Sequence, residues 1–363
     1  MTQVASDEAI PAVSLPPPAT PQLPPTTAQP APANTQPPPA TAQLPMPHLQ
    51  VPAAHAQLPP VTQREGHSWA PVSACVPGCL PADGSLPRVG RARLAARLTG
   101  LMALLFATAV VVAALPLLPD RRRGGLMRAA FLGVLRAVGV RLVHTGAPRF
   151  DLGDQAGSAN GVGSANGGVL VVANHLSWLD ILVLGGVQPM RMVAKREVRE
   201  WPVIGALAER AGTLFVDRAG LRALPTVVAQ AAVALREGGV VGLFPEGTTW
   251  CGAARGVFRR AGFQAALDAG VPVRPVAQRM RLPDGTSTAV GAFIGEDTLL
   301  ASLLRVARLP ELVIEVEVLP LLLPEPGLDR RELARRAELA IAAATGVPAP
   351  TPARRPSALR TAA

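Results

Sequence analysis

The pattern of apolar and polar positions divides the chain into a polar arm, an apolar stretch and an alternating region. Residues 1–92 are dominated by Pro, Ala, Thr and Gln, so this arm cannot bury enough surface to offset its chain entropy and is expected to be disordered. Residues 98–118 contain no charged side chain and are about long enough to span a bilayer. From Val169 onward, short apolar runs alternate with helical stretches, which is typical of an α/β domain.

The alternating region predicts a mixed, mostly parallel sheet flanked by helices. We expect it to be preceded by an N-terminal pair of membrane-anchoring helices and by the disordered arm. The expected strands are residues 169–173, 190–194, 213–216, 240–244, 273–277 and 312–318. The expected helices of this domain are residues 177–186, 201–211, 222–236, 260–269 and 328–344.

A second apolar segment, residues 126–142, carries three arginines among Leu, Phe and Val, a pattern that fits a helix lying in the membrane surface. The pair forms either one span with a surface helix or a two-helix anchor that enters one leaflet. Arginines flank the first helix on both sides, so the charges do not fix its orientation. The expected divisions are 1–92 for the arm, 93–145 for the anchor, 146–345 for the catalytic domain and 346–363 for a disordered tail.

The composition of the chain limits the kinds of molecule that it is expected to bind. The net charge is +10, which suits an anionic membrane surface. Aromatic residues make up only 3% of the chain, tyrosine is absent and no nucleic-acid-binding motif is present, so we expect no nucleic-acid partner. Of the three cysteines, Cys75 and Cys79 fall in the arm without companion ligands at metal spacing, and Cys251 is expected to be a small buried residue.

His175 and Asp180 are the strongest candidates for chemistry. On one continuous helix, residues five apart point about 140° apart, so the pair can meet only if His175 precedes a helix and Asp180 lies in its first turn. Ser177 and Asp180 match a capping box, with Ser177 at the cap. The carboxylate would hold one imidazole nitrogen and leave the other free to deprotonate a substrate hydroxyl. The alternative is that Asp180 only complements the positive end of the helix.

Other segments follow this pair in a recognisable order. They are residues 192–205, residues 212–218, residues 244–248 and residues 271–276. Together with the His175–Asp180 segment, their order and spacing resemble the glycerolipid acyltransferase family, the membrane enzymes that acylate lysophosphatidic acid and related lysolipids. The resemblance covers roughly residues 98–344.

The resemblance implies an O-acyltransferase at the cell membrane, with its catalytic domain on the cytoplasmic side. The expected donor is acyl-CoA or acyl carrier protein, the expected acceptor is a lysophospholipid, and no cofactor or metal is expected. The resemblance implies catalysis by His175 and Asp180, and a free backbone N–H beside Gly247 could help to stabilise an oxyanion. The substrate-binding candidates are Arg218, Glu246, Gly247, Thr248 and Lys195, of which Lys195 either supports the site or extends along the surface.

The chain departs from the family pattern after residue 248. Many lysophosphatidic acid acyltransferases have arginine there, whereas this chain has Thr249 and Trp250. The arginines that could replace the missing cation are Arg255, Arg259 and Arg260.

The leading interpretation is conversion of 1-acylglycerol-3-phosphate to phosphatidic acid. One alternative is acylation of another lysolipid, such as lyso-ornithine lipid. A second is a non-catalytic membrane scaffold that recruits partners through its Pro-rich arm. A soluble hydrolase is disfavoured because no Gly-x-Ser-x-Gly elbow is present.

Overall fold

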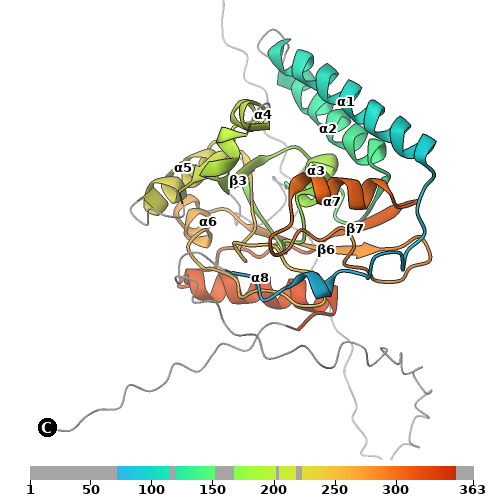
Figure 1. The fold of residues 1–363 in the computed structure, drawn as a ribbon. Helices are drawn as coiled ribbons and strands as arrows, with labels where there is room; N and C mark the ends of the chain where they lie inside the picture. Colours follow the sequence, from blue (N-terminus) through green and yellow to red (C-terminus); the bar gives the residue numbers. More distant parts are fainter. Residues whose placement is uncertain (1–71, 115–119, 152–166, 202–203, 218–222, 349–363) are drawn as a thin grey trace, which may run out of the picture. The chain divides into compact units, whose positions relative to one another are not determined.

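The computed structural model describes residues 72–114, 120–151, 167–201, 204–217 and 223–348. Its centre is a sheet of seven strands in the order β1-β7-β6-β2-β5-β3-β4 (Figure 1). The strands are β1 (Val140–Gly146), β2 (Val169–Ala173), β3 (Arg191–Lys195), β4 (Leu214–Val216), β5 (Val240–Leu243), β6 (Val273–Arg281) and β7 (Leu312–Val318).

Strand direction determines where a site can form. Strands β6, β2, β5, β3 and β4 run parallel, whereas β7 pairs antiparallel with β6 and carries β1 parallel to itself. The carboxyl ends of β2, β3, β4 and β5 therefore meet at one edge of the sheet. In open α/β sheets, ligands bind in the crevice outside this edge.

Helices cover both faces of the sheet, and β2 shows why. Its residues are buried in alternation against two separate cores, with Val171 in one and Leu170 in the other. A strand buried on both faces has a continuous apolar sequence. The helices are α3 (Leu179–Val187), α4 (Ile204–Arg210), α5 (Leu224–Arg236), α6 (Phe263–Ala269), α7 (Leu299–Ala307) and α8 (Arg330–Thr345). The first core includes residues of α3 and α7, and the second includes residues of α5, α6 and α8.

Two N-terminal helices, α1 (Arg91–Ala114) and α2 (Asp120–Ala137), pack side by side, and α2 also packs on α3 (Figure 1). Close approach is possible because Gly185 lacks a side chain, and a Cβ there would lie 2.4 Å from the Phe131 ring. Arg97 ties α1 to the domain by donating hydrogen bonds to the carbonyls of Ala307, Leu309 and Pro310 at the end of α7. A cation is favourable at that position because it complements the negative end of the helix.

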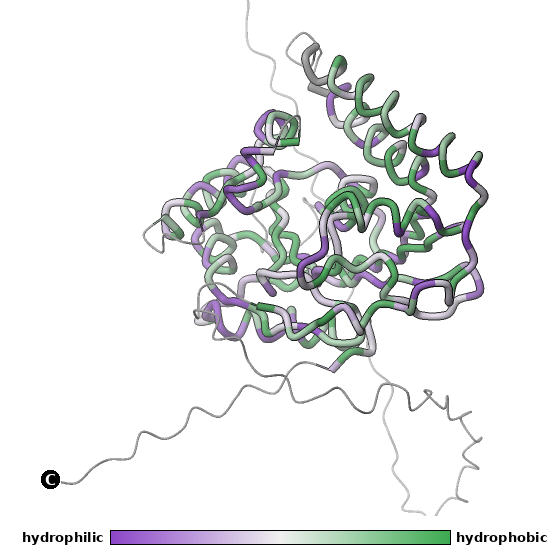
Figure 2. The backbone as a smooth tube through the Cα atoms, viewed as in Figure 1, coloured by the Kyte–Doolittle hydropathy of each residue, from purple (hydrophilic) through white to green (hydrophobic). Residues whose placement is uncertain are grey.

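Helix α1 is apolar along most of its length (Figure 2). Its segment Arg91–Val110 is long and apolar enough to cross a membrane, and only 6% of it is buried. Helix α1 nevertheless buries Leu101 in the first core, where α2 buries Leu135. Both helices therefore contact the globular domain, although most of α1 is exposed.

The predicted sheet and helices are confirmed, with ends that differ by a few residues. The prediction that residues 126–142 form one helix is wrong. Helix α2 ends at Ala137, Gly139 adopts a φ of 84°, and β1 begins at Val140. The left-handed φ favours glycine, and this residue reverses the chain into the sheet. Strand β1 and helix α7 were not expected at all. The expected arm (to residue 71), the tail (from residue 349) and the loop 152–166 lie outside the described residues.

Candidate active site

The loop between β2 and α3 brings His175 and Asp180 together as expected. His175 Nδ1 lies 2.8 Å from Asp180 Oδ2, and Asp180 is fully buried. The same oxygen accepts the backbone N–H groups of Leu176 at 2.6 Å and Ser177 at 2.9 Å. These three contacts converge on one carboxylate oxygen and fix the ring that it holds.

The predicted cap is wrong in one detail. Helix α3 begins at Leu179 rather than directly after Ser177, and the Ser177 hydroxyl caps nothing. Only half of the capping box forms, with the Asp180 carboxylate reaching back to the Ser177 N–H. The buried carboxylate is therefore committed to the loop and to His175 rather than to the helix end.

His175 is held on every side except one. Its ring stacks on the ring of Phe244 with a centroid separation of 4.0 Å. Its backbone N–H donates to Glu246 Oε2 at 2.7 Å, and its backbone carbonyl accepts a hydrogen bond from the backbone N–H of Trp250 at 2.8 Å. The imidazole is 19% exposed and lines the cleft described below. Because Nδ1 is engaged by Asp180, Nε2 is the nitrogen available to a substrate.

Glu246 supports the backbone of the site. It is 2% exposed, and its Oε1 accepts the N–H of Gly256 at 3.0 Å while its Oε2 binds the His175 N–H. Burial raises the pKa of Glu246 to about 7, although both backbone hydrogen bonds oppose that shift. Through these two hydrogen bonds, Glu246 connects the β2–α3 loop, which carries His175, to the β5–α6 loop, which carries Gly256.

Gly247 adopts a φ of 73°, a conformation that favours glycine, and its N–H closes a turn on the Phe244 carbonyl at 3.0 Å. That N–H is therefore not free for an oxyanion. The next N–H, on Thr248, has no backbone partner among the described residues, and Thr248 lines the cleft.

An amide pair that was not predicted anchors the start of the catalytic loop. Asn174 and Gln278 exchange three hydrogen bonds of 2.8–3.0 Å between the ends of β2 and the middle of β6. Both side chains are buried. The only signal in the sequence was an asparagine directly before His175, which by itself is uninformative.

A cleft of about 1960 Å³ opens in front of His175. Its lining has a charged part that includes Lys195, Glu246 and Arg255, which we call the charged end of the cleft. What we call its apolar end is the lining from α1, α2 and α3, which includes Leu101, Leu105, Phe131, Val134, Ile181 and Leu182. Arg218 lies outside the described residues, so its expected role stays a prediction. The preceding Asp217 lines the cleft and pairs with Arg196 at 3.2 Å.

Arg255 is a buried cation at the charged end of this cleft. Its side chain is 5% exposed and donates from Nη1 to the Glu338 carbonyl at 3.1 Å. Its Nε and Nη2 have no hydrogen-bond partner among the described residues, and Nη2 lies 4.0 Å from Glu338 Oε1 in an ion pair. Burial lowers the pKa of Arg255, whereas the charges of Glu246 and Glu338 raise it. A buried guanidinium with unused donors is suited to binding an anion.

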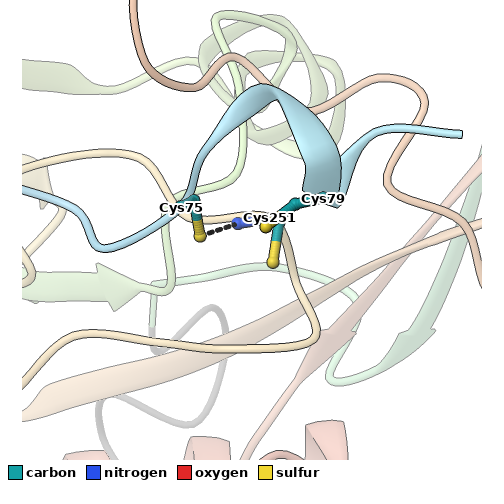
Figure 3. Close-up of side chains that lie close together, drawn as sticks. All are labelled: Cys75, Cys79 and Cys251. Carbon is teal, nitrogen blue, oxygen red and sulfur yellow. Dashed lines mark hydrogen bonds between the residues drawn. The ribbon is translucent and has the colours of Figure 1, made fainter. Parts of the chain in front are cut away.

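The three cysteines form a cluster, which corrects the interpretation that Cys75 and Cys79 lie in a disordered arm without companion ligands. Cys75 and Cys251 are buried, and the three sulfur atoms lie within 4.8 Å of one another (Figure 3). The Cys251 N–H donates to Cys75 Sγ at 3.2 Å. A hydrogen bond from the Cys75 thiol, assisted by the N–H groups of Ala253 and Ala254, lowers the pKa of Cys251 to about 5, and the same bond raises the pKa of Cys75.

Comparison with known proteins agrees with this geometry. A family model described as Acyltransferase matches residues 157–279. The chain is 43% identical over 188 residues to a lyso-ornithine lipid O-acyltransferase of Pseudomonas aeruginosa, covering 52% of this chain and 72% of that protein. It is 37% identical over 150 residues to a 1-acyl-sn-glycerol-3-phosphate acyltransferase of Neisseria gonorrhoeae, covering 41% of this chain and 58% of that protein.

Among solved structures, a 1-acyl-sn-glycerophosphate acyltransferase from Thermotoga maritima aligns with a TM-score of 0.48 and 19% identity. The alignment covers 70% of this chain and 94% of that one.

Proposed function

The chain belongs to the glycerolipid acyltransferase family, and we propose that it transfers a fatty acyl group from a thioester to the hydroxyl of a lysolipid, with His175 as the general base. The observation that carries this proposal is the 2.8 Å contact between His175 Nδ1 and the buried Asp180 carboxylate, at the mouth of a cleft with one charged and one apolar end. Such a cleft matches a lipid with a polar head and a hydrocarbon tail.

In the proposed reaction, His175 Nε2 removes the proton from the acceptor hydroxyl, and the oxygen attacks the thioester carbonyl. Asp180 keeps the ring in the tautomer that presents Nε2 and stabilises the imidazolium that forms. The tetrahedral intermediate collapses, and the imidazolium returns the proton to the departing thiolate. The Thr248 N–H is the candidate donor to the oxyanion, because the Gly247 N–H is already used in its turn. The donor is acyl-CoA or acyl carrier protein.

The acceptor we favour is a lyso-ornithine-type lipid rather than lysophosphatidic acid. The Thr249 hydroxyl donates to the Phe293 carbonyl and Trp250 binds His175, so the position that is arginine in many lysophosphatidic acid enzymes is used internally. Sequence identity is also higher to the lyso-ornithine lipid enzyme. Ornithine carries a carboxylate, and Arg255, a cation that lines the cleft, is the proposed partner for such a group. Lys195 and Glu246 complete the charged end of the cleft, and Arg218 stays a candidate for the same head group.

The apolar end of the cleft is the proposed site of the acyl chains. It reaches α1, whose apolar segment is almost entirely unburied. We infer that α1 and α2 hold the catalytic domain at the cell membrane, with that domain on the cytoplasmic side where acyl thioesters are made. A lysolipid could then enter the cleft without leaving the bilayer.

The test is a His175→Ala variant assayed in isolated membranes with a labelled acyl thioester and defined lysolipids. Loss of general base catalysis should lower turnover by about 10²–10⁴-fold. The matched control is His144→Ala, which removes an exposed histidine that contacts only the Ala147 carbonyl in the described structure. Turnover near wild type in His175→Ala, with normal expression, would exclude the proposed base.

The same assay separates the two acceptors. Wild-type membranes should acylate lyso-ornithine lipid faster than 1-acylglycerol-3-phosphate at equal concentration. The opposite preference would leave the His175 chemistry intact and overturn only the choice of head group.

A further inference from the structure

The cysteine cluster joins two segments that are far apart in the sequence. Cys79 is the last residue of the short 3₁₀ helix Pro77–Cys79, and Cys75 lies two residues before that helix. Cys251 lies in the loop between β5 and α6 that carries the Glu246 motif (Figure 3). Each residue contributes one sulfur atom, and the three sulfurs lie within 4.8 Å of one another. These are all the cysteines of the chain.

The local geometry is that of a thiolate metal site. Two cysteines separated by three residues fall within the spacing of about two to four residues that is usual for paired zinc ligands. With Zn–S bonds of about 2.3 Å in a tetrahedron, ligand sulfurs are about 3.8 Å apart, so small side-chain rotations would close the group on an ion. The backbone N–H of Cys251 already donates to Cys75 Sγ, the kind of outer hydrogen bond that orients a ligand.

We propose that Cys75, Cys79 and Cys251 bind a zinc ion. A disulfide would use two of the sulfurs and leave the third, packed beside them, without a role. Thiolate ligands favour soft or borderline metals such as zinc. Each cysteine gives up its thiol proton on binding, so metal uptake releases protons to solvent.

The surroundings fit an ion with three protein ligands. No His, Asp or Glu joins the three sulfurs in the part of the chain that the structure describes, so a water molecule completes the tetrahedron. Apolar residues enclose the rest of the site, including Ala292, Ile294, Leu80 and Trp250. Cys79 is only partly buried and provides the path by which an ion enters.

The ion would stabilise the active site without taking part in the reaction. Trp250, next to Cys251, donates its N–H to the His175 carbonyl. Residues Val72, Ser73 and Ala74, next to Cys75, line the cleft. One ion would therefore connect the segment 72–80 to the loop between β5 and α6, whose Trp250 contacts the backbone of His175. Its removal should loosen that loop and lower turnover, with His175 itself unchanged.

The experiment uses the full chain purified in detergent from cells grown without added metal. Metal content measured by plasma emission should give about one zinc per chain, as for a single thiolate site. Cys79→Ser, at the least buried position, should lose the ion, and so should the triple serine variant. Ser85→Ala, which changes an exposed side chain five residues beyond the segment 72–80, should keep it. Cobalt added to the metal-stripped wild type should give thiolate charge-transfer bands and the visible spectrum of a tetrahedral ion.

Thiol titration distinguishes the alternatives on wild-type protein, even if the variants fail to fold. Three thiols that react only after a chelator removes the ion support the proposal. A disulfide, seen as one reactive thiol before reduction and three after, overturns it. Three freely reactive thiols with no cobalt spectrum also overturn it, and copper or iron in place of zinc overturns the choice of metal. None of these outcomes depends on acyl transfer, so the proposed function is tested separately.

Discussion

The two walls of the cleft differ in how firmly their residues are held. On the catalytic wall, Asp180 is fully buried, Glu246 is 2% exposed and both bind backbone N–H groups of neighbouring loops. On the apolar wall, which α1 helps to form, only 6% of the segment Arg91–Val110 is buried. Chemistry requires a fixed geometry, whereas a lipid chain needs only apolar surface. The contrast therefore assigns catalysis to one wall and lipid contact to the other.

Replacing Asp180 should cause the largest loss. Asp180→Asn keeps the shape but removes the charge that stabilises the imidazolium and fixes the tautomer of His175. In a serine protease the equivalent change lowers kcat by about 10⁴-fold, and we expect a loss of about 10³-fold here. The measurement is single-turnover acyl transfer by purified protein.

A suitable control is Asp297→Asn, which removes the charge of a carboxylate that is 9% exposed and paired with Arg305. It should affect unfolding but leave the turnover of folded protein near wild type. If both variants lost activity equally, the loss would reflect general destabilisation rather than the contact with His175.

Glu246 should make the folding stability of the protein depend on pH. Its pKa rises from an ordinary 4.5 to about 7 because of burial, so between these values the folded protein binds more protons than the unfolded chain. Stability should therefore fall as pH rises through this window, by about 3 kcal/mol in total, and level off above it. In Glu246→Gln that dependence should be largely absent.

Denaturant unfolding of the full chain between pH 5 and pH 8 measures this effect. Glu325→Gln, an exposed glutamate paired with Arg336, is the matched control and should keep the wild-type slope. A slope that survives in Glu246→Gln would place the titrating group elsewhere.

Arg255 tests the charged end of the cleft, with a smaller expected effect. Arg255→Gln should raise the KM for the lysolipid by about tenfold, or about 1.4 kcal/mol, as expected for one lost charge-assisted hydrogen bond, and should change kcat little. Arg335→Gln, an exposed arginine on α8, should change neither. A fall in kcat at constant KM would instead indicate that Arg255 positions Glu246.

The sequence could predict the parts of the fold and of the site that depend on local patterns. Strand β2 is buried on both faces, so its apolar run was unambiguous, and the spacing of His175 and Asp180 allowed one arrangement in which they meet. Strand β1 was missed because its residues continue the apolar pattern of α2, and only the conformation of Gly139 separates the two.

Long-range pairing accounts for the other omissions. The Asn174–Gln278 amide pair and the cysteine cluster each join segments more than a hundred residues apart. Local periodicity does not report such contacts. Residues 72–80 directly follow the Pro-rich arm and form too short a segment to show a periodic pattern, so only their packing against the loop of Cys251 distinguishes them.

The smallest effect concerns the lipid side of the molecule, at the exposed surface of α1. Met102, Phe106 and Val110 recur every four residues on one face and are 65%, 74% and 54% exposed. Four-residue spacing aligns side chains along a helix, so this face offers a continuous apolar stripe to the bilayer. If α1 rests in lipid, Phe106→Gln should weaken vesicle binding by about 1 kcal/mol, or about fivefold. Leu339→Gln, an exposed leucine on α8, should leave binding unchanged.

Vesicle flotation of purified protein at several lipid concentrations measures this partition. Activity towards a short-chain, water-soluble acceptor should be the same in both variants, because neither side chain lines the cleft. Equal binding by both variants would remove this stripe of α1 from the lipid contact. Loss of activity towards the soluble acceptor in Phe106→Gln would show that α1 shapes the active site itself, and the division of labour between the two walls would no longer hold.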